Sequence, residues 1–434
     1  MNMTELTSVL DALVGPYMAG QRWFGAADQT APPRVVRVSE LRPPWPALAH
    51  VITQAASGER YQLVFGLHPA DKIADKAGQD LGGLNVALPE GDAMFVDATS
   101  DPESAIALFH VVCDEEVTTA RPVTAEQSNT SIVYDERLIM KLFRRLSGRN
   151  PEIEMTEALA RTGFTHIAEP VASWSDDTDD LALVQRFLVG GIEGWALALT
   201  SLRDFLDQGG DPGDAGGDMG PEAERLGEMT AELHLALAEA FGTAPGDADK
   251  WASSIARRAG EVDHPDLDRS AISAVVERVR TISDAGAAIR IHGDYHLGQV
   301  MRTDEGWYVL DFEGEPMRPV EERRQAASPL RDVASMLRSF SYAAAVGARE
   351  HGGGPDDEAA SASWEQHNRS AFLAAYLGRL QGSPLLPSHP ASTRQLLHAL
   401  EMDKAIYEVG YEQAHRPDWV QIPLAAVGRL VATP

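Results

Sequence analysis

The sequence predicts an α+β protein whose N-terminal part is rich in strands and whose C-terminal part is mainly helical. Three observations carry this prediction. Segments such as RVVRVSELRP and RYQLVFGLHP alternate apolar and polar residues, as half-buried strands do. The segments SIVYDERLIMKLFRRL and GRNPEIEMTEALARTG follow in the order strand, strand, helix. Beyond residue 190, segments such as EAERLGEMTAELHLALAEAF carry apolar residues at helical spacing.

Length and charge limit the class of protein. A chain of 434 residues is too long for one compact core, so we expect two or three domains. The net charge of −28 repels nucleic acid and anionic membranes, so we expect neither of them as a partner. An anionic ligand must therefore be held locally by basic groups, backbone amides or a metal. With no run of 18 apolar residues and no basic N-terminal leader, we expect a cytoplasmic protein without a membrane span.

The order of the segments divides the chain into three predicted units: residues 1–90, 91–189 and 190–434. In the first unit, Trp23 and Phe24 lie between two glycines, and we expect this aromatic pair to anchor one unit against another. In the second unit, Asn150 is a good N-cap and Pro151 suits the first helical turn. The apolar strand LALVQRFLVGG then runs into a glycine pair, which predicts a hinge.

Lys141 lies in the otherwise apolar strand LIMKLF, where a buried ammonium group needs a partner. The following helix offers Glu154 and Glu157, and the alternative is an exposed lysine on an edge strand. A polar turn precedes the strand pair, and its hydroxyl, amide and backbone N–H groups could cradle phosphates. The turn contains Gln127, Ser128, Asn129, Thr130 and Ser131. The segment has no glycine-rich loop, and by itself it is weak evidence for a phosphate site, because most clusters of Ser, Thr and Asn form ordinary turns.

The segments HGDYHLGQV and YVLDFEGEP carry the strongest chemical signal. Phosphoryl transfer requires a group that orients the attacking hydroxyl, metal ligands and a cation on the phosphates. Asp294 and Gln299 have the spacing of five residues seen in kinase catalytic loops, and Asp311 ends a predicted strand. Glu313 would share one side of that extended chain with Asp311. The ordered set of Lys141, Glu154, Asp294, Gln299 and Asp311 favours a kinase over a buried polar cluster.

Two histidines flank Asp294 in the same segment. His292 is expected to brace the turn by hydrogen bonds, with Asp332 of SPLRDVASML as its buried partner. His296 could approach phosphate, although packing is the simpler interpretation.

With these motifs in place, the chain resembles the aminoglycoside phosphotransferase superfamily, and within it the actinobacterial maltokinase-like enzymes and their sister group, the bacterial glucosamine kinases. The resemblance covers nearly the full chain and rests on QRWFG, EQSNTSIVYDERLIMKLFRRL, NPEIE, HGDYHLGQV, DFEGEP, SPLRDVASMLRSF and RPDWVQIPL. It implies a bilobal protein-kinase-like fold with an N-terminal cap subdomain and a mainly helical C-lobe. It also implies an enzyme that uses ATP and Mg²⁺, and we expect this enzyme to be a monomer.

Residue roles follow from the matching motifs. Lys141 and Glu154 would be the ATP lysine and its helix partner, and residues 124–131 would form the phosphate-binding loop. Asp294 would take the proton of the acceptor hydroxyl. Mg²⁺ would be held by Gln299, Asp311 and Glu313, and the adenine hinge would include Gln185, Phe187 and Val189.

We expect the acceptor site to lie along the C-terminal helix. Its candidate residues, beside Asp294 and His296, are Asp403, Tyr407, Glu408, Tyr411, Glu412 and Trp419. Aromatic faces and carboxylates suit a sugar, and a carboxylate-rich pocket suits a cationic amino sugar, although an acidic protein has acidic helices in any case. The resemblance favours glucosamine phosphorylated at its 6-hydroxyl. Maltose phosphorylated at its 1-hydroxyl is second, and an aminoglycoside kinase or a nucleotide-binding pseudokinase remains a further alternative.

Overall fold

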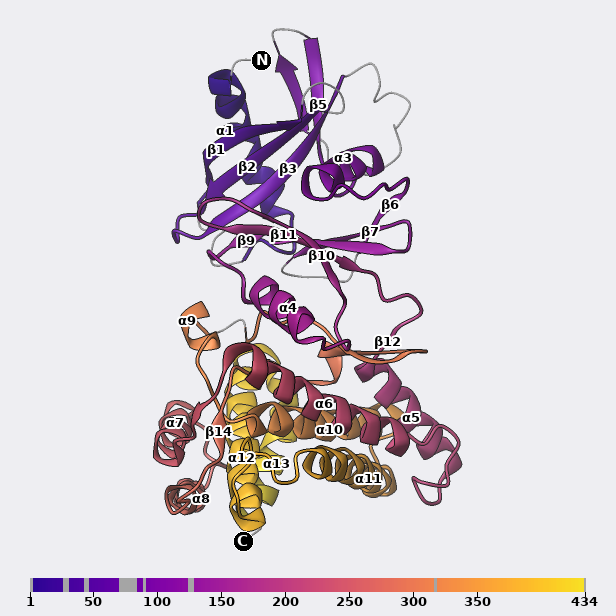
Figure 1. The fold of residues 1–434 in the computed structure, drawn as a ribbon, viewed down its shortest axis with the longest axis vertical. Coiled ribbons are helices and arrows are strands. Elements are labelled where there is room, and N and C mark those ends of the chain that lie inside the picture. The colour runs from indigo at the N-terminus through magenta and orange to yellow at the C-terminus, as the bar shows by residue number, and fades with distance from the viewer. Residues whose placement is uncertain are drawn as a thin grey trace. The chain divides into compact units, whose positions relative to one another are not determined.

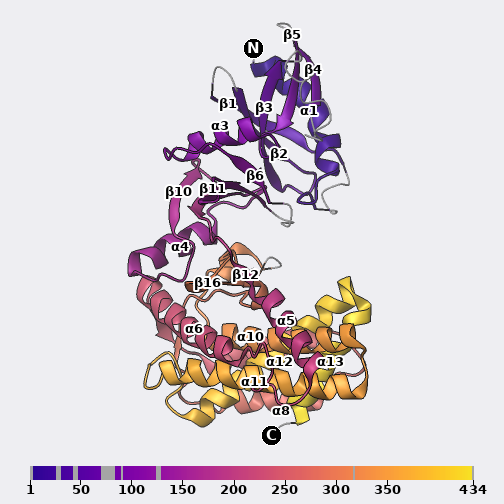
Figure 2. The same ribbon diagram turned by 90° about the vertical axis from the view of Figure 1, so that its right-hand side faces the viewer.

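The computed structural model describes residues 3–25, 31–42, 47–69, 84–88, 91–123, 129–315 and 318–432. The chain forms two compact units, drawn as ribbons in Figures 1 and 2. The first comprises Met1–Glu154 and Ala168–Val189, and the second comprises Met155–Ile167 and Gly190–Pro434. The chain leaves the first unit for the last time at Val189, next to the glycine pair of the predicted hinge.

An antiparallel sheet and one helix form the N-terminal part of the first unit. The helix is α1 (Met3–Ala19), and the strand order is β1 (Arg34–Arg42), β2 (Ala47–Gln54), β3 (Arg60–Pro69), β5 (Gly91–Asp97) and β4 (Leu84–Leu88). Leu10, Val14 and Met18 recur at helical spacing and are buried against the sheet. Because β5 pairs with β3, this sheet continues past the predicted boundary at residue 90.

The Trp23–Phe24 pair packs within the first unit. Phe24 meets the ring of Tyr61 edge to face at 5.1 Å, and the guanidinium of Arg144 lies 5.1 Å from the ring of Trp23. The pair therefore joins the N-terminal sheet to the segment that follows β8 (Leu138–Leu142), and so connects residues of the predicted units 1–90 and 91–189.

A second antiparallel sheet completes the first unit. Its strands are ordered β10 (Pro170–Ser175), β11 (Asp180–Arg186), β8, β7 (Thr130–Tyr134) and β6 (Ala120–Pro122). The hairpin β7–β8 turns at Asp135, whose positive φ of 50° is a conformation that Asp tolerates well. The predicted helix is α4 (Pro151–Thr162), which starts and ends within one residue of its sequence signals, Asn150 and Gly163.

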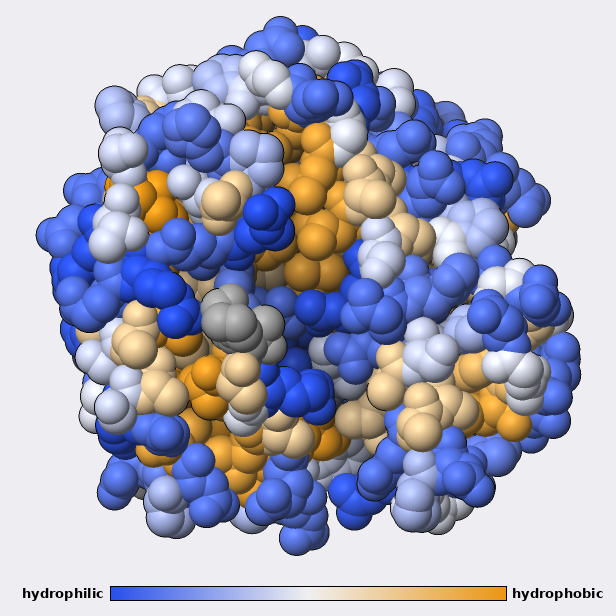
Figure 3. All heavy atoms as spheres, turned by 90° about the horizontal axis from the view of Figure 1, so that it is seen from below, coloured by the Kyte–Doolittle hydropathy of each residue, from blue (hydrophilic) through white to orange (hydrophobic). Residues whose placement is uncertain are grey.

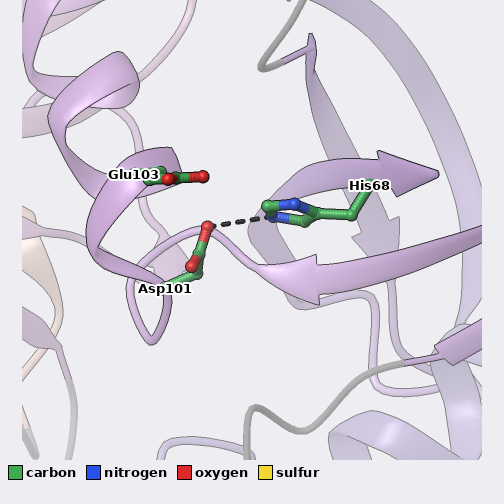
Figure 4. Close-up of side chains that lie close together, drawn as sticks. All are labelled: His68, Asp101 and Glu103. Atoms are coloured by element: carbon green, nitrogen blue, oxygen red, sulfur yellow. Dashed lines mark hydrogen bonds and ion pairs between the residues drawn. The ribbon is translucent and has the colours of Figure 1, made fainter. Parts of the chain in front are cut away.

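A buried histidine fixes the start of helix α3 (Pro102–Val112) against β3. The Nε2 atom of His68 lies 2.9 Å from Oδ2 of Asp101, which also accepts hydrogen bonds from the backbone N–H and the hydroxyl of Ser104. Figure 4 shows Glu103 beside this pair. Since Asp101 already caps the helix, we interpret the cluster as a structural connection between strand and helix.

The second unit is mainly helical, as predicted. Its main helices are α5 (Gly194–Gln208), α6 (Gly220–Phe241), α7 (Ala248–Glu261), α8 (Arg269–Arg280), α10 (Leu330–His351), α11 (Pro355–Arg379), α12 (Pro390–His415) and α13 (Gln421–Ala432). A small hairpin of β15 (Val300–Thr303) and β16 (Gly306–Val309) interrupts them. None of the helices described here combines the length and the apolar character that a membrane span requires.

One face of the molecule, the lower one in Figure 1, is mostly hydrophilic and contains a hollow in which hydrophobic side chains gather (Figure 3). In the second unit, an apolar cavity of about 920 Å³ lies where α11 ends and α12 begins. Leu373, Leu377 and Leu386 contribute to its lining.

Candidate functional site

The turn that carries Asp294 lies between α8 and β15 in the second unit. Gly293 takes a positive φ of 85°, which glycine adopts without strain. His296 accepts a hydrogen bond from the N–H of Gly298 at 3.0 Å and so caps the short helix Leu297–Gln299. Within the described residues, no hydrogen bond is donated to the carboxylate of Asp294. The Nε2 atom of His296 lies 3.9 Å from this carboxylate. A positioned carboxylate of this kind can accept a proton from a ligand hydroxyl.

Asp332 holds this turn from the start of α10. Its two carboxylate oxygens accept the backbone N–H groups of His292 at 2.8 Å and Gly293 at 2.9 Å. The predicted partnership with His292 is thus confirmed for the backbone, whereas the ring of His292 bonds the carbonyl of Leu310 at 2.9 Å. His234, which the sequence analysis missed, lies 3.3 Å from Asp332. These bonds fix the peptide that precedes Asp294.

The pKa of Asp332 makes this contact testable. Burial alone would raise that pKa, but the hydrogen bonds from His234 and Gly293 hold it below its ordinary value. The ionised group therefore stabilises the fold above the unfolded pKa of about 4, and this contribution is lost as pH falls. We expect Asp332→Asn to lower the free energy of unfolding by about 1.5–3 kcal/mol near neutral pH.

The same difference should shrink as pH falls below the unfolded pKa of about 4, because protonation then favours the unfolded chain over the fold that holds the ionised carboxylate. Urea unfolding of both proteins at neutral pH and near pH 3 measures it. A deficit of equal size at both pH values would contradict the role given to the ionised group.

The segment after β16 brings together the predicted metal ligands of the second unit. Nε2 of Gln299 lies 3.3 Å from Oδ2 of Asp311, and carboxylate oxygens of Asp311 and Glu313 lie within 4.8 Å of each other. The predicted geometry was wrong, because β16 ends at Val309 and Asp311 has a positive φ of 57°. A turn rather than an extended strand therefore places Glu313 beside Asp311.

This donor set fits Mg²⁺. Two carboxylates and one amide oxygen are hard oxygen ligands of the kind that Mg²⁺ prefers. The amide of Gln299 can present either its nitrogen or its oxygen to Asp311, because a rotation of the side-chain amide exchanges them.

Lys141 occupies the centre of the second sheet in the first unit, since β8 is flanked by β7 and β11. Its ammonium group forms a 2.7 Å ion pair with Glu152, and both side chains are largely buried. The prediction of Glu154 as this partner is corrected, as is the alternative of an edge strand. Helix α4 begins at Pro151, so Glu152 lies in its first turn, and Glu154 lies about 200° around the axis on the exposed face. Glu157 instead lies 3.9 Å from Arg161.

The predicted phosphate-binding loop is described only at its end. Gln127 and Ser128 fall outside the described residues, and Asn129 is buried. Ser131 lies directly opposite Lys141 in the β7–β8 register and is also buried. Thr130 accepts a hydrogen bond from Nε of Arg144 at 2.8 Å, which gives its hydroxyl a structural partner.

The predicted adenine hinge lies at the end of β11. The side chain of Gln185 donates to the carbonyl of Ala168 at 3.1 Å, so its amide is used to connect two chain segments. The backbone N–H of Phe187 donates to the carbonyl of Arg137 at 2.8 Å. Val189 is 63% exposed, which leaves it accessible at the end of the first unit.

Two predicted acceptor residues prove to be internal ion-pair partners. Glu408 is buried and accepts two hydrogen bonds from the buried Arg338, one from Nε at 3.0 Å and one from a terminal nitrogen at 2.8 Å. Glu412 is buried as well and receives Arg416 at 2.6 Å and the hydroxyl of Tyr342 at 3.0 Å. Both glutamates therefore have a cationic partner on the same unit, and their assignment to the acceptor site stays a prediction.

The other predicted acceptor residues lie on a neighbouring face of α12 and just beyond it. Tyr411 is 39% exposed, and its ring stacks on Tyr407. Both rings line a cavity of about 480 Å³ together with Arg258. Asp403 forms a 3.0 Å ion pair with Arg258, and Trp419 lies beneath the guanidinium of Arg416.

Sequence reasoning also missed polar residues of this cavity. Glu315 is buried and bonds the hydroxyl of Tyr407; burial would raise the pKa of Glu315, but Lys404 and Arg318 hold it below its ordinary value. Burial and Glu315 raise the pKa of Tyr407. The position of Glu315 within the motif DFEGEP was the available signal for its presence here.

Comparisons with known proteins agree with this geometry. A model described as "Phosphotransferase enzyme family" matches residues 119–364, and a model of the maltokinase N-terminal cap domain matches residues 17–101. A glucosamine kinase of Streptacidiphilus jiangxiensis is 27% identical over 422 residues, covering 89% of this chain and 92% of that protein. One of Mycolicibacterium smegmatis is 28% identical over 327 residues, covering 72% and 79%.

Solved structures share the fold. A glucosamine kinase structure superposes with a TM-score of 0.70 at 23% identity and covers 98% of this chain and 99% of its own. Another, in complex with glucosamine, ADP and inorganic phosphate, gives 0.68 at 22% identity and covers both chains completely. The predicted bilobal kinase-like fold with an N-terminal cap subdomain is thus confirmed.

Proposed function

Because the chain belongs to the phosphotransferase enzyme family, we propose that it transfers the terminal phosphoryl group of ATP to a hydroxyl of a small sugar. The observation that carries this proposal is the turn of Asp294. Its carboxylate is held on a fixed backbone, and the same unit brings Gln299 and Asp311 together. Phosphoryl transfer depends mainly on such positioning and on charge stabilisation.

The residues of each unit take separate roles in this reaction. In the first unit, Lys141, oriented by Glu152, would bind nucleotide phosphates. In the second, Asp294 would accept the proton of the acceptor hydroxyl as its oxygen bonds to phosphorus and ADP leaves. Gln299, Asp311 and Glu313 would hold Mg²⁺, which supplies positive charge to the phosphate oxygens when it is bound.

Glucosamine, phosphorylated at its 6-hydroxyl, is the acceptor we propose. The two glucosamine kinases that match 89% and 72% of this chain support it. The argument from a carboxylate-rich pocket is weaker than the sequence suggested, because Glu408 and Glu412 are engaged by arginines. Maltose, phosphorylated at its 1-hydroxyl, is the second candidate, favoured by the match to the maltokinase cap domain. A monomeric state and a cytoplasmic location stay predictions.

A coupled assay of ADP release with Mg²⁺-ATP tests the proposal. The acceptor panel contains glucosamine, glucose, maltose, N-acetylglucosamine and kanamycin. We expect turnover with glucosamine that clearly exceeds turnover with maltose. Preferential turnover of maltose would show that the proposed acceptor is wrong, whereas the proposed transfer of phosphate from ATP to a sugar would stand. Nucleotide binding without turnover of any acceptor would contradict the reaction itself and favour a nucleotide-binding pseudokinase.

A further inference from the structure

A basic cavity of about 460 Å³ lies in the second unit beside the turn that carries Asp294. Its lining comes from α7, from His292 and Gly293 of the turn, and from the segment between Gly314 and Arg331. Cavities of this size hold small-molecule ligands in many proteins.

The charge of this cavity is opposite to that of the chain. Among the described residues, its lining contains two carboxylates, Glu315 and Glu322, and five cationic side chains: Lys250, Arg257, Arg318, Arg323 and Arg331. The whole chain has a net charge of −28. A local excess of cations in an acidic protein creates a site where an anion can bind despite long-range repulsion.

Three of the five cations have protein partners. Arg318 forms an ion pair with Glu315, and Arg257 pairs with Glu261 at 2.9 Å. Arg323 donates to the backbone carbonyl of Arg318 at 2.8 Å. These contacts restrain Arg318 and Arg323 before any ligand binds, which lowers the entropic cost of binding, whereas Arg257 is largely exposed in its pair.

Arg331 differs from these neighbours. It lies in the first turn of α10 and is partly buried, and no hydrogen bond or ion pair joins its guanidinium to the described residues. Burial and the guanidinium groups of Arg318 and Arg258 lower the pKa of Arg331, and the carboxylates of Asp403 and Glu315 offset this only in part. An anion in the cavity would compensate that charge. The planar fork of a guanidinium matches the oxygens of a phosphate group.

We propose that this cavity binds a phosphate group, with Arg331 as its central ligand. Inorganic phosphate and the phosphomonoester of a sugar phosphate share the required chemistry, since both present several anionic oxygens on one phosphorus. The proposal rests on the cavity alone and does not depend on the acceptor proposed above.

Isothermal titration calorimetry tests it with two probes, inorganic phosphate and glucosamine 6-phosphate, at constant ionic strength. We expect Arg331→Gln to raise the Kd by roughly 10- to 100-fold. Arg331→Lys keeps the charge and loses the fork, so a smaller increase is expected. Arg203→Gln, which removes an exposed arginine of α5 outside the cavity, is the matched control and should bind as the wild type does. Circular dichroism verifies that each variant is folded.

The two probes distinguish the source of the phosphate. Tighter binding of glucosamine 6-phosphate would assign the site to a sugar phosphate, and binding of phosphate alone would assign it to the inorganic ion. If wild type and Arg331→Gln bound the two probes with equal affinity, the proposal would be overturned. The measured binding would then come from another site, such as the nucleotide site, which the substitution leaves intact. Equal losses in Arg331→Gln and Arg203→Gln, or no binding of either probe at millimolar concentration, would overturn it as well.

Discussion

Asp294→Asn is expected to lower kcat by roughly 10²- to 10⁴-fold, the usual contribution of a positioned general base. The substitution keeps the size of the side chain and removes its ability to accept the hydroxyl proton. The fold should not change, because Asp294 is partly exposed and its carboxylate accepts no hydrogen bond from the described residues. Nucleotide affinity should change little, since the proposed phosphate contact of Lys141 is untouched.

Asp304→Asn is the matched control for this experiment. Asp304 is an exposed aspartate in the turn between β15 and β16, and its neutralisation changes the net charge by the same amount. Kinetics of ADP release and calorimetric titration with ADP measure the two effects separately. If Asp294→Asn and Asp304→Asn retained similar kcat values, the assignment of Asp294 as the base would be refuted.

The contact between Gln299 and Asp311 could be predicted from the sequence. These two residues are close along the chain, and the β15–β16 hairpin brings them together without long-range information. The catalytic role of Asp294 stays a prediction. The predicted extended conformation of the segment that contains Asp311 was wrong, and its cause is also local. Asp311 adopts a positive φ, a conformation that Asp tolerates, and no pattern in YVLDFEGEP required it.

The partner of Lys141 could not be identified from sequence spacing. Glu152, Glu154 and Glu157 all follow the strand within one helix, and the choice among them depends on where that helix begins. The Asn150 side chain accepts the N–H of Glu152 at 2.8 Å and so fixes the first turn. Asn150 was recognised as a cap. To select Glu152, the direction of each glutamate also had to be followed around the helix axis from that cap, at 100° per residue.

The C-terminal carboxylates illustrate a different limit. An acidic residue on a helix looks the same in the sequence whether it binds a ligand or a buried arginine. Glu408 pairs with Arg338, 70 residues earlier in the chain, and no local pattern encodes such a contact. The packing of α10 against α12 decides it, and this depends on the tertiary structure.

Breaking the buried pair of Arg338 and Glu408 should therefore affect stability more than substrate binding. We expect Glu408→Gln to lower the free energy of unfolding by about 3–5 kcal/mol, because it leaves the buried guanidinium without a counter-charge. Glu412→Gln is the comparison variant: its partner Arg416 is half exposed, so water can solvate the cation, and a loss of about 1 kcal/mol is expected. Urea unfolding followed by circular dichroism measures both.

A double variant separates the loss of a pair from the loss of a charge. In Arg338→Met/Glu408→Leu no unpaired charge remains, so much of the stability lost in Glu408→Gln should return. The KM for the sugar in this variant should stay close to the wild-type value if Glu408 has a purely structural role. Wild-type stability in Glu408→Gln together with a raised KM for the sugar alone would instead return Glu408 to the acceptor site. The two measurements thus separate the roles of Glu408, because the Arg338 pair engages its Oε2 atom and predicts an effect on stability, whereas contact with the sugar predicts an effect on the KM.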